Sequence, residues 1–213
     1  MLVVRDLWKS YGDLQVLKGI TLTIEEGSLV TITGPNGSGK TTLVRILSGL
    51  LQPSRGFATI RGFKVGSFEA RRLTTVILDK PLLYEDLTVE ENLKLFKTLM
   101  GSGGGSYYNL AFEKLSINKV LYRKVGELSH GWRRRVDLVR ALINDPKLVL
   151  FDELTTAFDL DTLRTVSEIL GFMARNGSIV IVTGPNSHEL MSVLNETTHL
   201  CELTNGILKC ETS

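Results

Sequence analysis

Apolar residues along the chain follow two different periods. Residues 29–33, 148–151 and 179–182 are short apolar or β-branched runs, the pattern of strands that are buried on both faces. Residues 162–174 instead place apolar side chains three and four positions apart, as a helix that covers a sheet does. Helices that alternate with buried strands predict an α/β fold, in which helices flank a mainly parallel core sheet.

Two further segments predict antiparallel strands. Residues 2–24 carry apolar patches broken by turn residues, and residues 199–210 enclose Asn205 and Gly206, the favoured pair of a type I′ hairpin turn. We therefore expect an N-terminal antiparallel β-subdomain and a β-hairpin around residue 205 in addition to the parallel sheet.

A helical insert is predicted at about residues 87–140. Thr88 and Glu91 have the spacing of a capping box, and an apolar helix face follows them. A second helix is expected after Ser129, whose hydroxyl is a suitable N-cap. Residues 101–106 consist of glycine and serine, which predicts a flexible linker inside the insert.

Chain length and composition limit the possible classes of protein. We expect residues 1–213 to form a single domain, and the net charge of +2 gives no electrostatic argument for binding nucleic acid. Cys201 and Cys210 lack the spacing of a redox or zinc motif, which predicts two free thiols and a reducing, cytoplasmic location. The sequence contains no signal segment and no membrane-spanning apolar run, so any role at a membrane is expected to depend on a partner.

A glycine-rich segment at residues 34–42 is the strongest chemical signal. It matches G-x-x-x-x-G-K-[ST] between a predicted strand and a predicted helix, where backbone N–H groups surround phosphates. Lys40 is expected to neutralise the phosphates of a nucleoside triphosphate and the Thr41 hydroxyl to bind Mg²⁺. An ordinary strand-to-helix turn would need neither this spacing nor the Lys-Thr pair. The residues expected to hold the nucleotide here are Gly34, Pro35, Asn36, Gly37, Ser38, Gly39, Lys40, Thr41 and Thr42.

Two adjacent carboxylates follow the buried run at residues 148–151. Asp152 and Glu153 therefore lie at the carboxyl end of a core strand, where open parallel sheets bind their ligands. Next to a phosphate loop, Asp152 is expected to hold Mg²⁺ and Glu153 to polarise an attacking water. A solvated strand end is the alternative interpretation of this pair.

A short motif at residues 128–132, Leu-Ser-His-Gly-Trp, is similar to the Leu-Ser-Gly-Gly-Gln signature of ATP-binding cassette (ABC) proteins. Residues 84–93 are similar to the start of the helical insert in that family. Over essentially its whole length, the chain resembles the nucleotide-binding subunit of an ABC transporter. The resemblance implies a P-loop NTPase fold of the ABC ATPase type, with ATP and Mg²⁺ as cofactors.

The resemblance also implies roles for individual residues. Tyr11 matches the aromatic residue that stacks on adenine, Lys40 a group that holds the β and γ phosphates, and Glu153 the catalytic base. Ser129 and Gly131 match groups that reach the γ phosphate of ATP bound to an opposite subunit. The active form would then be a head-to-tail homodimer, or a heterodimer with a second ABC ATPase subunit. This dimer would bind a transmembrane permease at the cytoplasmic face of the membrane.

Several positions depart from the family pattern. Asp79 stands where the family has a glutamine that senses Mg²⁺ and water, so it could ligate the metal or repel the other carboxylates. Gly184 replaces a switch histidine, and loss of such a donor typically slows chemistry by about 100-fold or more. His188 is a candidate substitute. His130 and Trp132 place rings in the signature, where they could loosen the closed dimer, donate to phosphate, or simply pack or lie exposed.

These features support three functional hypotheses. The leading one is an ATP-hydrolysing subunit that energises a membrane transporter, in particular an exporter, by ATP-driven dimerisation. The second is an ATP-binding regulatory module with slow or no turnover, which Asp79, His130 and Gly184 would permit. The third is an ABC ATPase that acts on other proteins or on ribosomes and not in transport. The basic residues 133–135 are expected to form a solvated helix face and not a nucleic-acid site.

Overall fold

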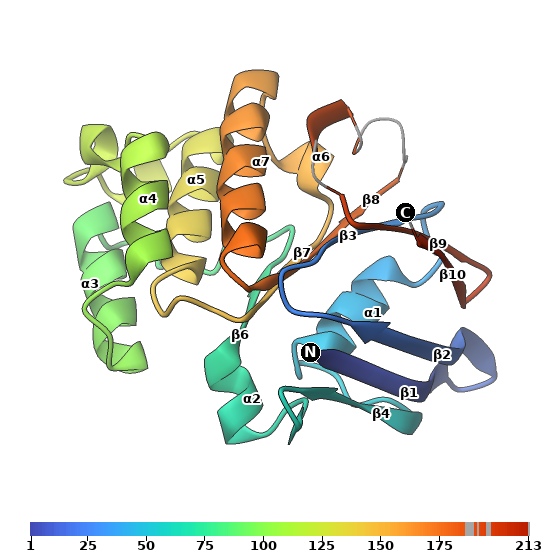
Figure 1. Ribbon diagram of the computed structural model, residues 1–213. Helices are drawn as coiled ribbons and strands as arrows, with labels where there is room; N and C mark the ends of the chain where they lie inside the picture. Colours follow the sequence, from blue (N-terminus) through green and yellow to red (C-terminus); the bar gives the residue numbers. More distant parts are fainter. Residues whose placement is uncertain (186–189, 191, 195–196, 213) are drawn as a thin grey trace.

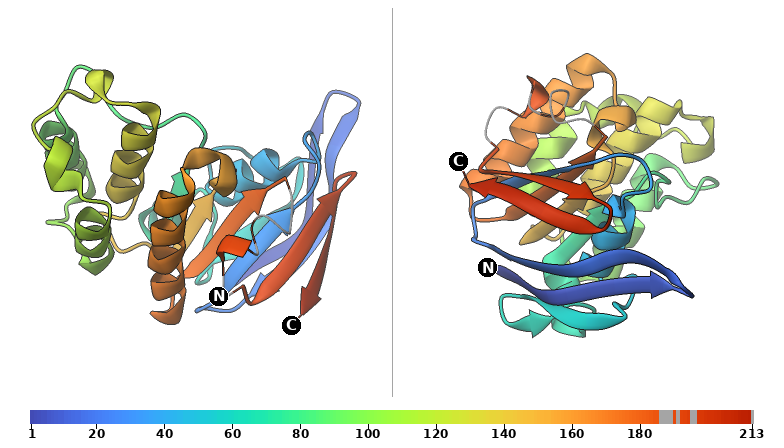
Figure 2. Two further views of the ribbon diagram at one scale, coloured as in Figure 1. Left: turned by 90° about the horizontal axis from the view of Figure 1, so that it is seen from above. Right: turned by 90° about the vertical axis from the view of Figure 1, so that its right-hand side faces the viewer.

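The computed structural model describes residues 1–185, 190, 192–194 and 197–212 as two sheets with helices packed on them (Figure 1). A six-stranded sheet is covered by a layer of helices on one face, and α1 (Lys40–Leu47) and a four-stranded sheet lie on the other (Figure 2). Two buried apolar clusters fill these two interfaces. The central sheet is thus buried on both faces, as the apolar runs predict.

The six-stranded sheet is parallel except at one edge. Its strands are β3 (Leu29–Thr33), β6 (Thr74–Ile77), β7 (Leu148–Phe151), β8 (Ile179–Gly184), β9 (His199–Thr204) and β10 (Ile207–Thr212). Their order is β10-β9-β3-β8-β7-β6, with β10 antiparallel to β9. Val149 and Phe151 point into one apolar cluster and Leu148 and Leu150 into the other, because successive strand residues face opposite sides. The predicted parallel core is confirmed.

The N-terminal strands form a separate antiparallel sheet, as predicted. Helix α2, which the sequence pattern did not predict, follows this sheet, and the Ser67 hydroxyl caps it by accepting a hydrogen bond from Ala70 N at 3.2 Å. The strand order is β2-β1-β4-β5. These elements are β1 (Leu2–Tyr11), β2 (Leu14–Ile24), β4 (Arg55–Ile60), β5 (Phe63–Lys64) and α2 (Phe68–Leu73).

The predicted insert forms the helical layer at the left of Figure 1. Its capping box is confirmed, since Glu91 N donates to the Thr88 hydroxyl at 3.2 Å and Thr88 N donates to the Glu91 carboxylate at 2.8 Å. In the described part of the chain, no helix is both long and apolar enough to cross a membrane. The helices and 3₁₀ turns of the insert are α3 (Val89–Met100), α4 (Ser106–Lys114), η1 (Ile117–Val120), η2 (Val125–Glu127) and α5 (His130–Ala141). Two further helices, α6 (Leu154–Ala157) and α7 (Leu160–Arg175), follow β7.

Residues 101–106 are bonded to the insert and do not form the free linker that their composition predicts. Gly101 ends α3 in a left-handed conformation with φ of 62°. The Asp145 carboxylate accepts hydrogen bonds from Ser106 N at 3.0 Å and from Tyr107 N at 2.9 Å. A side chain from beyond α5 therefore caps α4 and fixes the glycine-rich segment.

Strands β9 and β10 form the predicted hairpin. Asn205 has φ of 53° and Gly206 has φ of 80°, as a type I′ turn requires. The turn places Cys201 opposite Cys210, and the two residues are joined by a disulfide. The prediction of two free thiols is therefore wrong, and the argument for a reducing location loses its basis. Motif spacing missed this pair because the hairpin register, and not a short sequence motif, brings the two thiols together.

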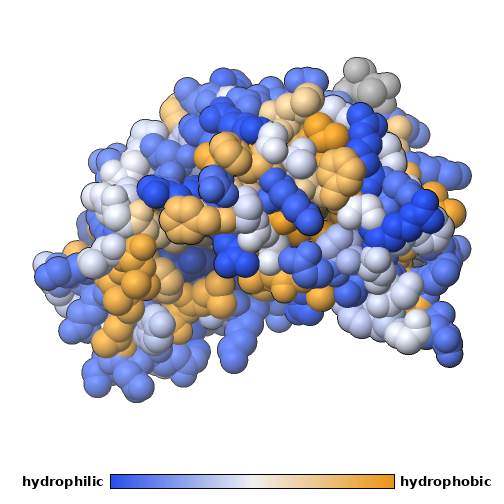
Figure 3. Space-filling view, turned by 90° about the horizontal axis from the view of Figure 1, so that it is seen from below, coloured by the Kyte–Doolittle hydropathy of each residue, from blue (hydrophilic) through white to orange (hydrophobic). Residues whose placement is uncertain are grey.

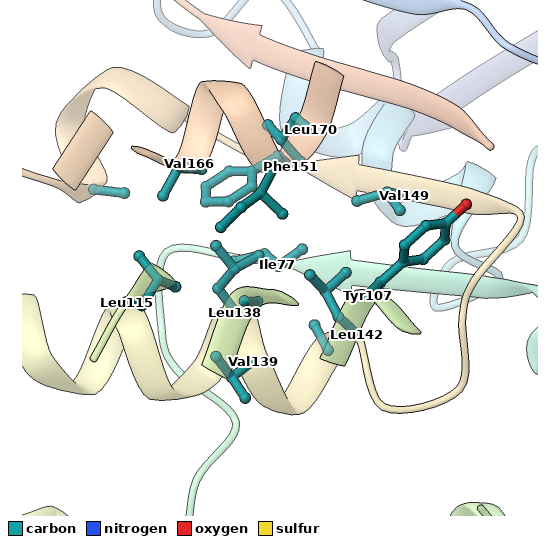
Figure 4. Packing of buried hydrophobic residues seen from close by; sticks show 14 of the residues in the cluster. Ile77, Tyr107, Leu115, Leu138, Val139, Leu142, Val149, Phe151, Val166 and Leu170 are labelled. Carbon is teal, nitrogen blue, oxygen red and sulfur yellow. The ribbon is translucent and has the colours of Figure 1, made fainter. Parts of the chain in front are cut away.

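One apolar face anchors helix α5 to the central sheet. Leu138 of α5 and Leu142, the residue at the C-terminal cap of this helix, face Ile77 of β6 and Phe151 of β7 (Figure 4). All four side chains are completely buried. This packing fixes the helix that carries the signature motif relative to the strand end that carries Asp152.

Candidate nucleotide-binding site

The predicted phosphate loop leaves the carboxyl end of β3 and leads directly into α1. Gly39 has a left-handed φ of 108°, and a Cβ there would lie 2.8 Å from Leu17 Cδ2. A Cβ on Gly34 would lie 2.1 Å from Leu203 O. The close approach of β2 and β9 therefore requires glycine at both positions. The N-terminal sheet and the terminal hairpin hold the loop between them.

The lysine of this loop is buried. Lys40 is 5% exposed, and its ammonium group donates to Gly34 O at 2.7 Å and to Pro35 O at 3.1 Å. The Ser38 hydroxyl is buried and has no hydrogen-bond partner among the described residues. A buried cation and an unpaired hydroxyl beside backbone N–H groups are suited to bind phosphate oxygens.

Thr183 at the end of β8 holds the two adjacent carboxylate residues. Its hydroxyl donates to Asp152 Oδ1 at 2.7 Å and accepts from Glu153 N at 3.0 Å. Asp152 is 3% exposed, whereas Glu153 adopts a left-handed φ of 58°, a conformation that is rare outside glycine and common at functional sites. The sequence analysis did not identify Thr183. The available signal was a hydroxyl at the end of a buried apolar run, next to Gly184.

A cavity of about 530 Å³ opens between the phosphate loop and the predicted catalytic base. Tyr11, at the end of β1, is 49% exposed and has the Lys9 ammonium 5.0 Å from its ring centroid, but it does not line this cavity. The structure thus brings the predicted phosphate loop and base together and leaves the predicted adenine-stacking residue outside. The lining residues are Val16, Asn36, Gly37, Gly39, Lys40, Thr41, Thr42 and Glu153.

The signature residues lie in another part of the molecule. Ser129 is exposed and caps α5, its hydroxyl accepting from Trp132 N at 3.5 Å. In the part of the chain that the structure describes, a Cβ on Gly131 would meet no atom within 4 Å, so no contact there requires glycine. Neither Ser129 nor Gly131 lines the cavity beside the phosphate loop. Helix α5 belongs to the layer at the left of Figure 1, whereas β3 and α1 lie further to the right.

All three arginines of residues 133–135 form ion pairs within the chain. The prediction of a solvated helix face is wrong for Arg134, whose side chain is 1% exposed. Arg135 also stacks 4.8 Å from the ring of Trp132, which is half-buried, while His130 is exposed. The three ion pairs are Arg133–Glu85 at 3.2 Å, Arg134–Asp79 at 2.9 Å and Arg135–Asp159 at 3.2 Å.

Asp79 has a partner that the sequence analysis did not consider. Arg134 Nη2 donates to Asp79 Oδ1 at 2.9 Å, although the Asp79 side chain is 87% exposed. The carboxylate is paired with a cation. The two roles considered from the sequence, ligation of Mg²⁺ and repulsion of Asp152 and Glu153, did not include this ion pair.

Asp159 caps helix α7. Its carboxylate accepts from Thr162 N at 2.9 Å and from the Thr162 hydroxyl at 2.9 Å. The backbone hydrogen bond, the hydroxyl hydrogen bond and the charge of Arg135 together hold the pKa of Asp159 below its usual value. Asp159 therefore connects the start of α7 with α5.

Gly184 lies against a buried leucine. A Cβ at this position would lie 2.8 Å from Leu190 Cδ1 and 3.1 Å from its Cγ. Leu190 is completely buried, so a histidine at position 184 would require it to move. His188, the candidate substitute, lies outside the described residues.

Sequence comparison relates these features to known proteins. The sequence model described as ABC transporter matches residues 17–156, which include the phosphate loop, the signature and the adjacent carboxylates. The chain is 33% identical over 211 residues to the Nod factor export ATP-binding protein I of Rhizobium sp. (strain N33), covering 93% of this chain and 66% of that protein. It is 29% identical over 207 residues to a lantibiotic transport ATP-binding protein of Streptococcus pyogenes, covering 97% of this chain and 86% of that protein. The chain thus spans just under two thirds of the first relative and most of the second.

Solved structures share the fold. The structure of an ATP binding subunit of an ABC transporter superposes with a TM-score of 0.88 at 26% identity, covering 100% of this chain and 90% of that one. A dimeric, post-hydrolysis ATP-binding cassette bound to ADP and Pi gives a TM-score of 0.85 at 28% identity, covering 100% and 98%. Fold and phosphate loop define the class as an ABC-type P-loop ATPase. Because the family match covers well over half of it, the chain belongs to the ABC transporter family, whose members bind ATP.

Proposed function

We propose that this chain is an ATP-hydrolysing subunit that energises a membrane transporter, in particular an exporter. The observation that carries the proposal is the cavity in which Lys40, Thr41 and Glu153 meet at the end of the central sheet. The names of relatives that describe Nod factor export and lantibiotic transport support a role in moving a substrate out of the cell.

The phosphate loop would bind ATP through charge and backbone N–H groups. The Lys40 ammonium now donates to two loop carbonyls, at 2.7 and 3.1 Å, and phosphate oxygens would replace these partners. Glu153 would accept a proton from the water that attacks the γ phosphate. Thr183 holds Asp152 and the backbone of Glu153 by two hydrogen bonds, so both residues would be oriented before the substrate arrives.

Thr41 and Asp152 are the residues that would hold Mg²⁺. The hydroxyl of Thr183 orients the Asp152 carboxylate at 2.7 Å, as partners of metal ligands typically do. Across the described residues, no group of three or more His, Cys, Asp or Glu side chains could hold a metal ion by itself. The ion would therefore be shared with ATP and water, as is usual for Mg²⁺. When bound, Mg²⁺ neutralises charge on the phosphates.

A second subunit would complete the site. Ser129 caps the twelve-residue helix α5 and Gly131 lies in its first turn, and a helix N-terminus favours an anion through its free N–H groups and its dipole. In a head-to-tail homodimer or heterodimer, this end of α5 would face the γ phosphate of ATP bound to the opposite subunit. The dimeric state of a cassette with a TM-score of 0.85 supports this arrangement.

A transmembrane permease would bind the groove between α2 and α3. The groove has a volume of about 480 Å³, and its lining includes exposed Phe68 and Leu99 together with Arg71 and Arg72. Helices α2 and α3 lie low in Figure 1, and the face seen from below shows apolar side chains gathered beside hydrophilic ones (Figure 3). Apolar anchors with basic neighbours are suited to a short helix of the permease. Such a partner would hold the chain at the cytoplasmic face of the membrane.

ATP hydrolysis by the purified chain tests the enzyme proposal. Glu153→Gln removes the base and keeps the shape, so we expect kcat to fall by about 100-fold or more while ATP still binds. Glu168→Gln is the matched control, because Glu168 is an exposed carboxylate of α7 that pairs with Lys114 at 2.7 Å. The control should retain the wild-type rate.

A regulatory module that binds ATP without hydrolysing it is the second candidate. The observation that favours it is the close approach of Leu190 to Gly184. Leu190 fills the space that the side chain of the family's switch histidine would need. This candidate predicts ATP binding with no turnover and no effect of Glu153→Gln. That result would contradict the enzyme proposal.

A further inference from the structure

We propose that Asp79 and Arg134 form a charged tether that positions the signature helix α5 against the metal-binding end of the central sheet. Asp79 is then a positioning residue and not a metal ligand. The inference deepens the proposed function, because it states how one subunit fixes the helix that it presents to the ATP of its partner.

Arg134 is a buried cation that needs counter-charges. Its side chain is 1% exposed, and a buried charge is costly unless it is paired and hydrogen-bonded. Burial lowers the pKa of Arg134, and the charges of Asp79, Asp137 and Asp152 oppose that change. The guanidinium thus lies in the field of three carboxylates, one of which is the predicted Mg²⁺ ligand.

The guanidinium of Arg134 is bonded to the end of strand β6. Nη1 donates to Leu78 O, and Nη2 donates to Asp79 Oδ1 at 2.9 Å. Leu78 and Asp79 directly follow β6, which pairs in parallel with β7, the strand that leads to Asp152. A single side chain of α5 therefore connects this helix to the carboxyl end of the parallel strands, where nucleotide and metal would bind.

Asp137 provides a second connection further along α5. Its Oδ1 accepts from Leu82 N at 3.1 Å and from Arg140 Nε at 2.8 Å, and the side chain is completely buried. Residues 79–82 are therefore bonded to α5 at both ends. Movement of this loop toward a bound nucleotide would either carry α5 with it or break buried ionic hydrogen bonds.

Arg134 and Asp79 differ in exposure, so breaking their ion pair affects the two side chains unequally. Asp79 is 87% exposed and would be well solvated on its own, whereas Arg134 would stay buried with one fewer counter-charge. Loss of the Asp79 charge therefore acts mainly on α5. Because Ser129 caps the same helix, the disturbance reaches the signature end that a partner would contact.

Amide hydrogen exchange of the nucleotide-free chain tests the tether directly. In Asp79→Asn, we expect amides in the first two turns of α5 to exchange about 10-fold faster, because a charged hydrogen bond is lost. Asp79→Glu keeps the charge and should restore most of the protection. The control is Glu85→Gln, which removes an exposed carboxylate bonded at 3.2 Å to Arg133, a half-buried residue of the same helix, and should change exchange by less than about 2-fold. Equal exchange in Asp79→Asn and Glu85→Gln would overturn the tether.

A double-mutant cycle of Arg134 and Asp79 tests their coupling, whatever each single substitution does to stability. Arg134→Gln removes the buried cation, so adding Asp79→Asn to it should accelerate exchange in α5 no further. If the two substitutions instead act independently and their effects multiply, the two residues are not coupled and the tether is wrong.

The Mg²⁺ dependence of ATP hydrolysis separates a positioning residue from a ligand. Asp79→Asn should lower kcat by about 10-fold and leave the half-saturating Mg²⁺ concentration within about 3-fold of wild type. Asp152→Asn should raise that concentration by more than about 10-fold. A comparable rise in Asp79→Asn would make Asp79 a metal ligand and overturn the proposal. A wild-type chain that hydrolyses no ATP would contradict the proposed function only, since the exchange experiment uses no nucleotide.

Discussion

Two regions of this chain present their predicted functional groups in opposite ways. The phosphate-loop half comprises the loop at residues 34–42 and the strand ends that surround it, including Asp152 and Thr183. The signature half comprises helix α5 and its cap, Ser129. Lys40 and Asp152 in the first half are 5% and 3% exposed and are hydrogen-bonded within the chain. Ser129 in the second half is exposed, and among the described residues nothing lies within 4 Å of the position of a Cβ on Gly131. The buried groups are oriented by their surroundings in the chain, whereas in the proposed dimer Ser129 and Gly131 would be positioned by the packing and charges of α5 behind them.

The largest effect should come from the buried cation of the phosphate-loop half. Lys40→Ala removes the buried cation that we propose contacts phosphate, so we expect the affinity for ATP to fall by about 100-fold or more. Titration with a fluorescent ATP analogue measures this change. Lys64→Ala, at an exposed position in β5, is the control and should change affinity by less than about 2-fold. Equal affinities of the two variants would contradict the preorganised phosphate site.

The next effect should come from the disulfide that supports the same half. Cys201 lies opposite Ile32 of β3, the strand that leads into the phosphate loop. Cys210→Ser opens the covalent loop, and we expect the free energy of unfolding to fall by about 2–3 kcal/mol in urea denaturation. Dithiothreitol should destabilise the wild type by the same amount and the variant not at all. If the reductant destabilises both proteins equally, the disulfide is not the cause.

Introducing a histidine at position 184, where the family has its switch histidine, tests whether the phosphate-loop half has room for that side chain. Gly184→His must displace Leu190, so we expect a loss of about 1–3 kcal/mol in the free energy of unfolding. Adding Leu190→Ala should return part of that loss, because the new ring fills the space. Calorimetry or urea denaturation measures both effects. A Gly184→His variant that is fully stable and hydrolyses ATP faster would show that the space was already available.

The smallest effect should concern Asp159, which joins the signature helix to α7. Its pKa is lowered in the folded chain, so its charge stabilises the fold above its ordinary pKa, and this contribution is lost as the pH falls through the lower folded value. Asn caps a helix as well as Asp does, so Asp159→Asn keeps an oxygen that accepts from Thr162 N. It removes the charge, together with the second oxygen that accepts from the Thr162 hydroxyl and from Arg135. We expect the variant to melt slightly below wild type at neutral pH and to converge with it in acid. Asp161→Asn, an exposed first-turn residue of α7, is the control. A gap that persists in acid would assign the effect to something other than the charge.

Three local patterns in the sequence predicted local structure correctly, although helix α2 was missed and residues 101–106 do not form the predicted free linker. The capping box at Thr88, the turn at Gly206 and the phosphate loop each depend on residues a few positions apart, and the structure contains all three. The contacts that were missed join distant residues. Arg134 and Asp79 are 55 positions apart, and Asp145 caps α4 from the far side of α5, so both depend on how the helices pack.

The candidate site divides in the same way. Lys40, Thr41 and Glu153 meet around one cavity, as their motifs predict, because each motif lies at the end of a core strand. Thr183 was missed because a hydroxyl at a strand end has no distinctive pattern. The role of Ser129 stays a prediction, since its expected ligand would be bound to another subunit.

In the proposed function, the signature half of one subunit completes the phosphate-loop half of another. Sedimentation velocity of Glu153→Gln in ATP and Mg²⁺ tests it most directly, because this variant should retain ATP and accumulate the closed dimer. We expect a dimer in ATP, and a monomer both in ADP and without nucleotide. A chain that stays monomeric in ATP, while the wild type hydrolyses ATP at a specific rate independent of protein concentration, would contradict it.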